Sequence, residues 1–292
     1  MSGFSAEWLS LREPLDHASR NREVAAACAA HFAAAGEIAV LDLGCGTGSN
    51  LRALAPLLPQ RQRWRLVDRD HGLIRAARAE IIAWADDRGN FPDGSRPNKG
   101  GKALAVEFEQ ADLALDLDRV LALPAQLVTA TALFDLCSKG WLQDFAQRLA
   151  RKKLPLLAAL TYDGVAEWTP PHHADAAMRD AFHQHQRRDK GFGASAGPQA
   201  AQVLAGALEA QGYRLVRGAS PWRIGAGQDA LRRALAQGCA DAVRETGAVT
   251  SADIASWLEA RKQGGGCTIG HEDLFATPHW HRAPAGALFP EG

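Results

Sequence analysis

The chain has 292 residues, of which 47% are hydrophobic, and this is long enough for one large α/β domain with a substantial core. Lys and Arg together number 33, as do Asp and Glu, so the chain lacks the basic excess that proteins gripping nucleic acid backbones carry. A nucleic acid partner is therefore disfavoured. There is no apolar run of about 18 residues, so no transmembrane helix and no membrane partner are expected.

Two further features bear on location. Residues 1–13 lack the basic and apolar regions of a secretory signal. The five cysteines are far apart and form no CxxC pair, which favours reduced thiols over a disulfide framework. We therefore expect a cytoplasmic protein.

Short apolar runs alternate with segments of helical character along the chain. The runs predict strands at 38–43, 64–67, 103–108, 127–132, 155–162, 213–217 and 268–277. Helices are predicted at 14–36, 50–58, 71–87, 138–150 and 199–211, with two more in 228–262. An exposed loop is expected at 88–102. This alternation predicts a mostly parallel sheet covered on both faces, and the strand at 268–277 is expected at its edge.

The sharpest motif is Gly44-x-Gly46-x-Gly48, which follows the first strand and precedes a helix. Glycines let the backbone turn sharply and approach a ligand closely, and the helix offers free amide groups at its start. Dinucleotide-binding loops carry a third glycine one position later, where this chain has Ser49. Asp42 lies two residues before the loop, which suits a ligand with an ammonium and a sulfonium better than a pyrophosphate.

Two more carboxylates follow later strands. Asp68 ends the second strand, 20 residues after Gly48, where a carboxylate accepts hydrogen bonds from ribose hydroxyls. Asp112 follows the third strand and is placed to receive an exocyclic adenine amine. With the stretches LDLGCGTGSN (41–50), LVDRD (66–70) and QADLA (110–114), the sequence resembles the class I S-adenosylmethionine (SAM)-dependent methyltransferases, best over residues 36–162.

The resemblance implies a Rossmann-like α/β fold: a seven-stranded, mostly parallel, doubly wound sheet with an antiparallel last strand. We expect one domain over 1–292, with an N-terminal helical segment 1–36 and a lid or insert at 163–200. By motif, the glycines would line the methionine moiety, Asp42 would orient the loop and the amino group, and Asp68 would hold the ribose. The cofactor-binding residues implied are Asp42, Gly44, Cys45, Gly46, Gly48, Asn50, Asp68, Arg69, Asp112, Leu113, Ala130 and Thr131.

The end of the fourth strand reads Leu133-Phe134-Asp135-Leu136-Cys137-Ser138. The Asn/Asp-Pro-Pro-aromatic motif of enzymes that methylate exocyclic or amide nitrogens is absent there, which favours a small-molecule acceptor. Candidate catalytic residues are Asp135 and Tyr162, and candidate acceptor contacts are Phe134, Trp168, His185 and Trp222. The alternative for Asp135 is a helix cap or a salt bridge, and the alternative for the polar segment 162–192 is a solvated excursion.

Arg12 or Arg20 could bind the methionine carboxylate, against the alternative of an ordinary exposed helix charge. We assign no metal to His172-His173 or to His183-x-His185, because zinc needs three or four ligands with a closing partner. The rings of His183 and His185, two apart on a helix, would also point about 200° apart. The pair His279 and His281 is a weaker candidate still.

The sequence thus predicts an enzyme that transfers a methyl group from SAM to a small molecule by in-line displacement. Two alternatives stay open: a SAM-binding scaffold or partner subunit without catalysis, and a SAM-dependent aminopropyl or aminocarboxypropyl transferase. A nicotinamide dehydrogenase is disfavoured by Ser49.

Overall fold

A computed structural model describes residues 4–87 and 97–279. Within these residues, nine strands form one sheet in the order β3-β4-β2-β1-β5-β6-β9-β7, and β8 pairs with β9 beside this path. The strands are β1 (Glu37–Leu43), β2 (Arg61–Asp68), β3 (Asn98–Lys99), β4 (Lys102–Gln110), β5 (Leu127–Thr131), β6 (Leu156–Thr169), β7 (Tyr213–Ala219), β8 (Trp222–Ile224) and β9 (Gly266–Pro278).

The strands β4, β2, β1, β5 and β6 run parallel, whereas β9 is antiparallel to both of its main neighbours. The expected antiparallel last strand is therefore confirmed, but its predicted place at the sheet edge is wrong. β9 lies between β6 and β7, and most of its central residues are buried because it has a neighbouring strand on each side. Two short strands, β3 and β8, add to the seven expected.

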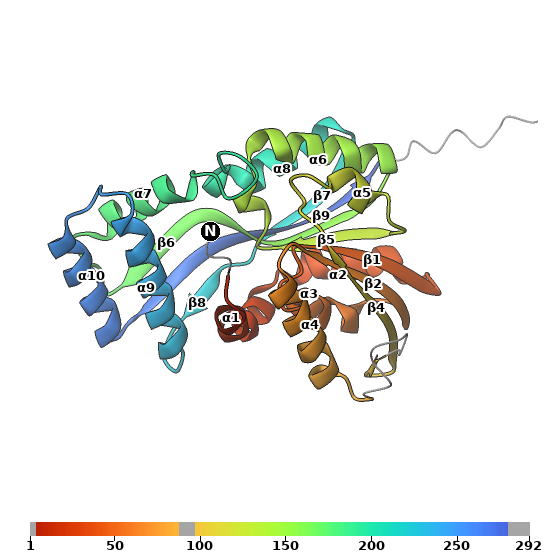
Figure 1. Cartoon of the computed structure of the whole chain (residues 1–292), viewed down its shortest axis with the longest axis horizontal. Coiled ribbons are helices and arrows are strands. Elements are labelled where there is room, and N and C mark those ends of the chain that lie inside the picture. The colour runs from red at the N-terminus through yellow and green to blue at the C-terminus, as the bar shows by residue number, and fades with distance from the viewer. Residues whose placement is uncertain (1–3, 88–96, 280–292) are drawn as a thin grey trace, which may run out of the picture.

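Helices cover both faces of the sheet (Figure 1). One face carries α2, α3 and α4, and the other carries α5, α6 and α8, which pack on one another. The helices are α1 (Ala6–Ser19), α2 (Arg22–Phe32), α3 (Ser49–Leu54), α4 (His71–Trp84), α5 (Leu117–Leu121), α6 (Lys139–Lys152), α7 (Asp175–Gln186), α8 (Ala200–Ala210), α9 (Asp229–Arg244) and α10 (Ser251–Gln263). None of the described helices is long and apolar enough to cross a membrane.

Three predicted elements differ from those observed. The predicted helix 14–36 is two helices, because Asn21 leaves the helical conformation and its side chain caps α2 by accepting from the amides of Glu23 and Val24. Within the predicted loop 88–102, residues 98–99 pair with β4, and 88–96 lie outside the described residues. Residues 163–169, predicted to begin the insert, continue β6.

The long strands β6 and β9 extend beyond the parallel part of the sheet and carry a second group of helices. Figure 1 shows α7, α9 and α10 around this extension, with α1 between it and α3. A separate apolar cluster, built around Met178, Trp257 and Leu258, joins α7, α9 and α10. The carboxyl ends of β1, β2, β4 and β5 therefore face the space beside α1 and this extension.

Candidate functional site at the carboxyl ends of the parallel strands

The glycine loop joins the end of β1 to the start of α3. Gly44, Gly46 and Gly48 all have left-handed backbone angles, with φ of 65°, 54° and 78°. Side chains with a Cβ rarely adopt this conformation, so the alternating glycines are a requirement of the turn. The loop amide of Cys45 donates to the carbonyl of Val67 at 2.9 Å, which ties the loop to β2.

A buried polar network lies directly beneath the loop. The Nδ2 of Asn50 donates to Asp42 Oδ1 at 2.7 Å and to Thr129 Oγ1 at 3.1 Å, and that hydroxyl donates to the carbonyl of Leu157. Asp42 is 1% exposed and its Oδ2 has no partner within the described residues. Burial raises the pKa of Asp42 to about 7, against the opposing effect of Asn50. Asp42 therefore orients the loop through Asn50.

The N-terminal segment folds over this network. Arg20, between α1 and α2, donates from Nη2 to Asn50 Oδ1 at 2.7 Å and to Thr131 Oγ1 at 3.2 Å. His17 of α1 contacts the carbonyl and hydroxyl oxygens of Ser49 at 3.1 and 3.0 Å. A Cβ on Gly46 would meet Leu9 at 3.1 Å. α1 thus covers the glycine loop, and Arg20 is part of the network rather than an exposed helix charge.

The second and third carboxylates lie at the next strand ends. Asp68 Oδ2 accepts from the amide of Gly46 at 2.9 Å, and Oδ1 accepts from the amide of Asp70 at 3.0 Å. Asp112, after β4, accepts from the amide of Ala114 at 2.9 Å, which holds the following turn. The bond from the Gly46 amide holds Asp68 beside the glycine loop.

The neighbours predicted beside these carboxylates lie at the same edge. Leu113 is buried, and its carbonyl accepts from the indole of Trp141. Arg69 is exposed at the end of β2, where its guanidinium lies against Gly191. The segment 191–196 also contacts residues 137–138, so this part of the predicted insert borders the strand ends.

The end of β5 carries the first candidate catalytic residue. Ala130 is fully buried, and the Thr131 hydroxyl accepts a hydrogen bond from Arg20. The chain then turns at Ala132, whose φ is 51°. Left-handed alanine is uncommon, and such strain is typical of functional turns. Asp135 follows on a short 3-10 turn, is partly buried and forms no ion pair among the described residues. Burial raises its pKa to about 6, against its own backbone amide and the charge of Arg12, which lower it.

Tyr162 on β6 is the second candidate catalytic residue. It is 6% exposed, and its hydroxyl lies 2.9 Å from His183 Nε2 of α7. Burial lowers the pKa of His183, and a hydrogen bond with the backbone of Gly164 acts in the opposite direction. Burial also raises the pKa of Tyr162, with a contribution from the charge of Asp135.

Three predicted acceptor contacts lie elsewhere. Phe134 is fully buried and packs on Phe145 in the main core. Trp168 lies at the far end of β6 and packs on Trp257 of α10. His185 faces α9, where its Nε2 is 3.1 Å from Glu245. The structure therefore corrects all three assignments.

Trp222 keeps a place beside the site. It is 4% exposed, donates from Nε1 to Asp16 Oδ1 at 3.0 Å and lies with its ring 5.1 Å from that of His271. Trp222 therefore packs behind His271 and Asp16 and exposes almost none of its surface.

The remaining histidines and cysteines are accounted for by local contacts. His172 lies 3.2 Å from Ser256, and His173 lies 3.1 Å from Asp253. No group of three His, Cys, Asp or Glu side chains with metal-binding geometry occurs in the described part of the chain. Cys45 is buried, and burial raises its pKa, so it fills space in the loop as a thiol. The candidate pair at 279 and 281 falls partly outside the described residues.

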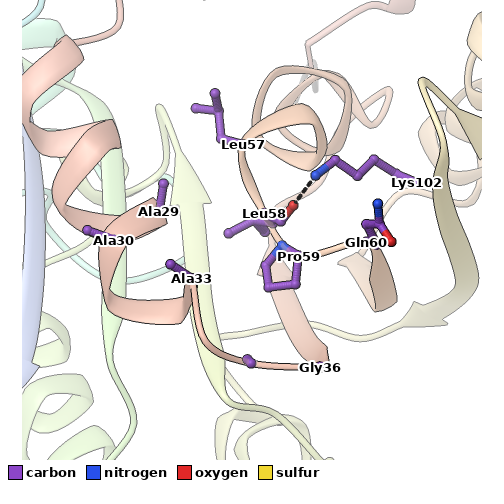
Figure 2. A pocket seen from close by; sticks show the side chains of 10 residues that line it. Ala29, Ala30, Ala33, Gly36, Leu57, Leu58, Pro59, Gln60 and Lys102 are labelled. Carbon is purple, nitrogen blue, oxygen red and sulfur yellow. Dashed lines mark hydrogen bonds between the residues drawn. The ribbon is translucent and has the colours of Figure 1, made fainter.

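A separate hollow lies at the opposite end of the parallel strands (Figure 2). It measures about 590 Å³ and is lined by small and apolar residues of α2 and of the turns before β1 and β2, together with Lys102. The Lys102 ammonium donates to the carbonyl of Leu58 at 2.7 Å. Because it lies beyond the amino ends of the strands, this hollow is not part of the site described above.

The strand order and the glycine loop can now be compared with known proteins. No family model and no curated protein sequence matches the chain. Among solved structures, a cyclopropane-fatty-acyl-phospholipid synthase-like protein from Lactobacillus casei is similar over 95% of both chains, with 15% identity and a TM-score of 0.54.

Weaker likenesses are to a magnesium protoporphyrin IX methyltransferase from Synechocystis, determined with bound SAH, and to a precorrin-6y C5,15-methyltransferase from Geobacter metallireducens. The first has 10% identity and a TM-score of 0.43 over 96% of this chain and 90% of that one. The second has 11% identity and a TM-score of 0.44 over 88% and 89%.

The chain shares a Rossmann-like α/β fold with the Lactobacillus casei protein. At the glycine loop, Thr47 Oγ1 is buried and has no partner among the described residues. Carboxylates of Asp68 and Asp112 stand at the two next strand ends.

Of the two arginines that the sequence offers for the methionine carboxylate, Arg20 lies in the network beneath the loop, whereas Arg12 pairs with Asp16. The sequence gives no role beside Tyr162 to His183 or His271. His183 and His271 approach Tyr162 from α7 and β9, with ring centroids 5.8 and 6.2 Å from it. No local pattern marks them, because their partners lie 21 and 109 positions away along the chain.

Proposed function

We propose that this protein is a SAM-dependent methyltransferase that acts on a small molecule in the cytoplasm, without a nucleic acid or membrane partner. The observation that carries the proposal is the set of three carboxylates, Asp42, Asp68 and Asp112, at the carboxyl ends of β1, β2 and β4 around a left-handed glycine loop. Such strand ends are where open α/β sheets bind ligands.

The roles of these residues follow from their contacts. Asp68 would accept hydrogen bonds from the ribose hydroxyls, in exchange for the loop amide it now holds. Leu113 and the turn held by Asp112 would line the adenine. Arg20, fixed by Asn50 and Thr131, would take the methionine carboxylate.

SAM supplies an activated methyl group whose carbon–sulfur bond breaks as the acceptor atom attacks, leaving the electron pair on sulfur. The protein's part is to orient the two molecules and to exclude water, and α1 provides a cover over the loop. Where the acceptor atom carries a proton, Asp135 would accept it. A pKa near 6 places this carboxylate close to the working pH, as general bases require.

Tyr162 and His183 would support this step. The Tyr162 hydroxyl, held 2.9 Å from His183 Nε2, would hydrogen-bond the acceptor. We propose that Asp135 and Tyr162 touch the acceptor and that His183 is a positioning residue acting through Tyr162.

Product analysis tests the proposal. The purified protein would be incubated with methyl-deuterated SAM and a small-molecule extract, and the products followed by mass spectrometry. We expect a product heavier by one deuterated methyl group, absent with Asp135→Asn. A mass increase of an aminopropyl or aminocarboxypropyl group would contradict methyl transfer, and binding of SAM without any product would favour a scaffold.

A further inference from the structure

Asp273 of β9 is a buried carboxylate that accepts hydrogen bonds from three separate segments of the chain. It is 3% exposed. Its Oδ2 accepts from the backbone amide of Asn21 at 2.8 Å. Its Oδ1 accepts from the amide of Leu160 at 2.8 Å and from the hydroxyl of Ser220 at 2.6 Å. Removing a carboxylate from water is unfavourable unless hydrogen bonds to its charged form compensate, so these bonds fix the three segments to one point.

The first of these segments is the junction between α1 and α2. The amide, carbonyl and side chain of Asn21 all form hydrogen bonds: Oδ1 caps α2, and Nδ2 donates to the carbonyl of Ala219 at 3.0 Å. Gly218 on β7 leaves the space for this side chain, because a Cβ there would collide with Asn21 Nδ2. The backbone at Asn21 is therefore fixed on β7 and β9, and Arg20 immediately precedes it.

The second segment is an irregular point in β6. The register between β6 and β9 shifts between Ala158 and Thr161, and Leu160 within this shift has a φ of 53°. A left-handed backbone is uncommon for a residue with a Cβ, and it persists only where the surroundings hold it. The hydrogen bond from the Leu160 amide to Asp273 supplies that support.

The two segments meet again at the side chain of Arg20. Its Nη2 donates to Thr131 Oγ1 of β5, and Thr131 lies beside Ala159 of β6 in the sheet. Asp273 therefore holds the backbone next to Arg20 through Asn21, and through Leu160 it holds the strand beside which Thr131 lies. Contacts thus fix Arg20 at both its backbone and its guanidinium.

The guanidinium of Arg20 keeps a donor that this network does not use. Nη2 makes the hydrogen bonds to Asn50 and Thr131, whereas Nε is buried and has no partner within the described part of the chain. Resting on the SAM site proposed above, we propose that Asp273 is a positioning residue that orients Arg20 toward the methionine carboxylate. Asp273 does not touch the ligand and acts through the backbone of Asn21.

Isothermal titration with two ligands tests this role: SAH, and the SAH analogue that lacks only the carboxylate. A residue that orients Arg20 affects the first ligand alone, whereas a general loss of structure affects both. In Asp273→Asn we expect the affinity for SAH to fall roughly tenfold and that for the analogue to stay within about twofold. The matched control Ser220→Ala removes one bond from the same carboxylate but leaves that of Asn21, and it should bind both ligands as the wild type does.

Two substitutions of Asn21 isolate its amide and leave the charge of Asp273 in place. Alanine and proline both lack the side-chain cap, but only proline lacks the N–H that donates to Asp273. The φ of −69° at Asn21 and the ψ of 137° at Arg20 both suit a proline at position 21. We expect Asn21→Pro to bind SAH more weakly than Asn21→Ala, with equal affinity for the analogue. This pair keeps the test decisive if urea denaturation shows that Asp273→Asn does not fold.

Arg20→Gln serves as the reference for the selective loss. It should weaken SAH and spare the analogue, and Asp273→Asn should add little to it in the double variant. The inference is overturned if Asp273→Asn weakens both ligands equally, if Asn21→Pro and Asn21→Ala bind SAH alike, or if the losses of Arg20→Gln and Asp273→Asn are additive. If the wild-type protein does not bind SAH, it is the proposed function that fails.

Discussion

The buried carboxyl of Asp42 makes the stability of the protein depend on pH, and Asp42→Asn should remove that dependence. The pKa of Asp42 is raised from 3.8 to about 7 in the folded protein, with burial as the main cause. A raised pKa means that the folded state prefers the protonated carboxyl. The stabilisation is therefore fully present below the unfolded pKa and is lost as pH rises through the folded pKa.

The size of the effect follows from the two pKa values. One pKa unit corresponds to about 1.4 kcal/mol, so the full contribution is about 4 kcal/mol, of which roughly 2.5 kcal/mol is lost between pH 5 and pH 8. Asparagine is neutral throughout and can still accept the hydrogen bond of Asn50. The free energy of unfolding of Asp42→Asn should thus fall less than that of the wild type over this range.

Urea denaturation at half-unit pH intervals measures this directly. The difference between wild type and Asp42→Asn isolates Asp42 from the other titrating groups. Asp180→Asn, at an exposed position on α7, serves as the matched control and should follow the wild-type curve. If the free energy of unfolding has the same pH dependence in the wild type and in Asp42→Asn, the buried carboxyl of Asp42 does not have a raised pKa.

Three further predictions concern the loop and the acceptor side. Gly48→Ala should lower the free energy of unfolding by roughly 1–2 kcal/mol and weaken SAM binding in calorimetry, because φ is 78° and a Cβ would meet Ile81 at 3.0 Å. Gly140→Ala on α6, where a Cβ meets nothing within 4 Å, should change neither quantity. Asp135→Asn should lower kcat by roughly 10²–10⁴-fold with unchanged SAM affinity, and should abolish the rise of kcat/KM as pH increases through about 6; an unaltered pH profile would exclude it as the base. His183→Gln should slow turnover in the wild type but not further in Tyr162→Phe, and additive losses in this double-mutant cycle would contradict a role through Tyr162.

The glycine loop and its carboxylates were predictable because each signal is local. Gly44 to Gly48, the strand before them and the Asp68 that ends the next strand lie within one βαβ unit, where strand ends necessarily meet at one edge. A serine before a helix is a local signal of the same kind, and the Ser138 hydroxyl accepts from the amide of Trp141 at the start of α6.

The acceptor side was harder to predict because it is assembled from distant segments. Arg20 reaches Thr131 across 111 positions, and Trp222 reaches Asp16 across 206. The place of β9 between β6 and β7 depends on strand order, which hydrophobic periodicity does not encode. For the same reason the aromatic Trp168 looked like a pocket wall, whereas it fills a second apolar cluster with Trp257.

The central claim is that SAM binds at the glycine loop with its ribose on Asp68. Isothermal titration of the wild type and of Asp68→Asn with SAM and with SAH tests it most directly. The account predicts that both ligands bind the wild type with one site per chain, and that Asp68→Asn loses about tenfold or more in affinity through its weaker bonds to the ribose hydroxyls. Binding of neither ligand, or equal affinity for the two proteins, would contradict it.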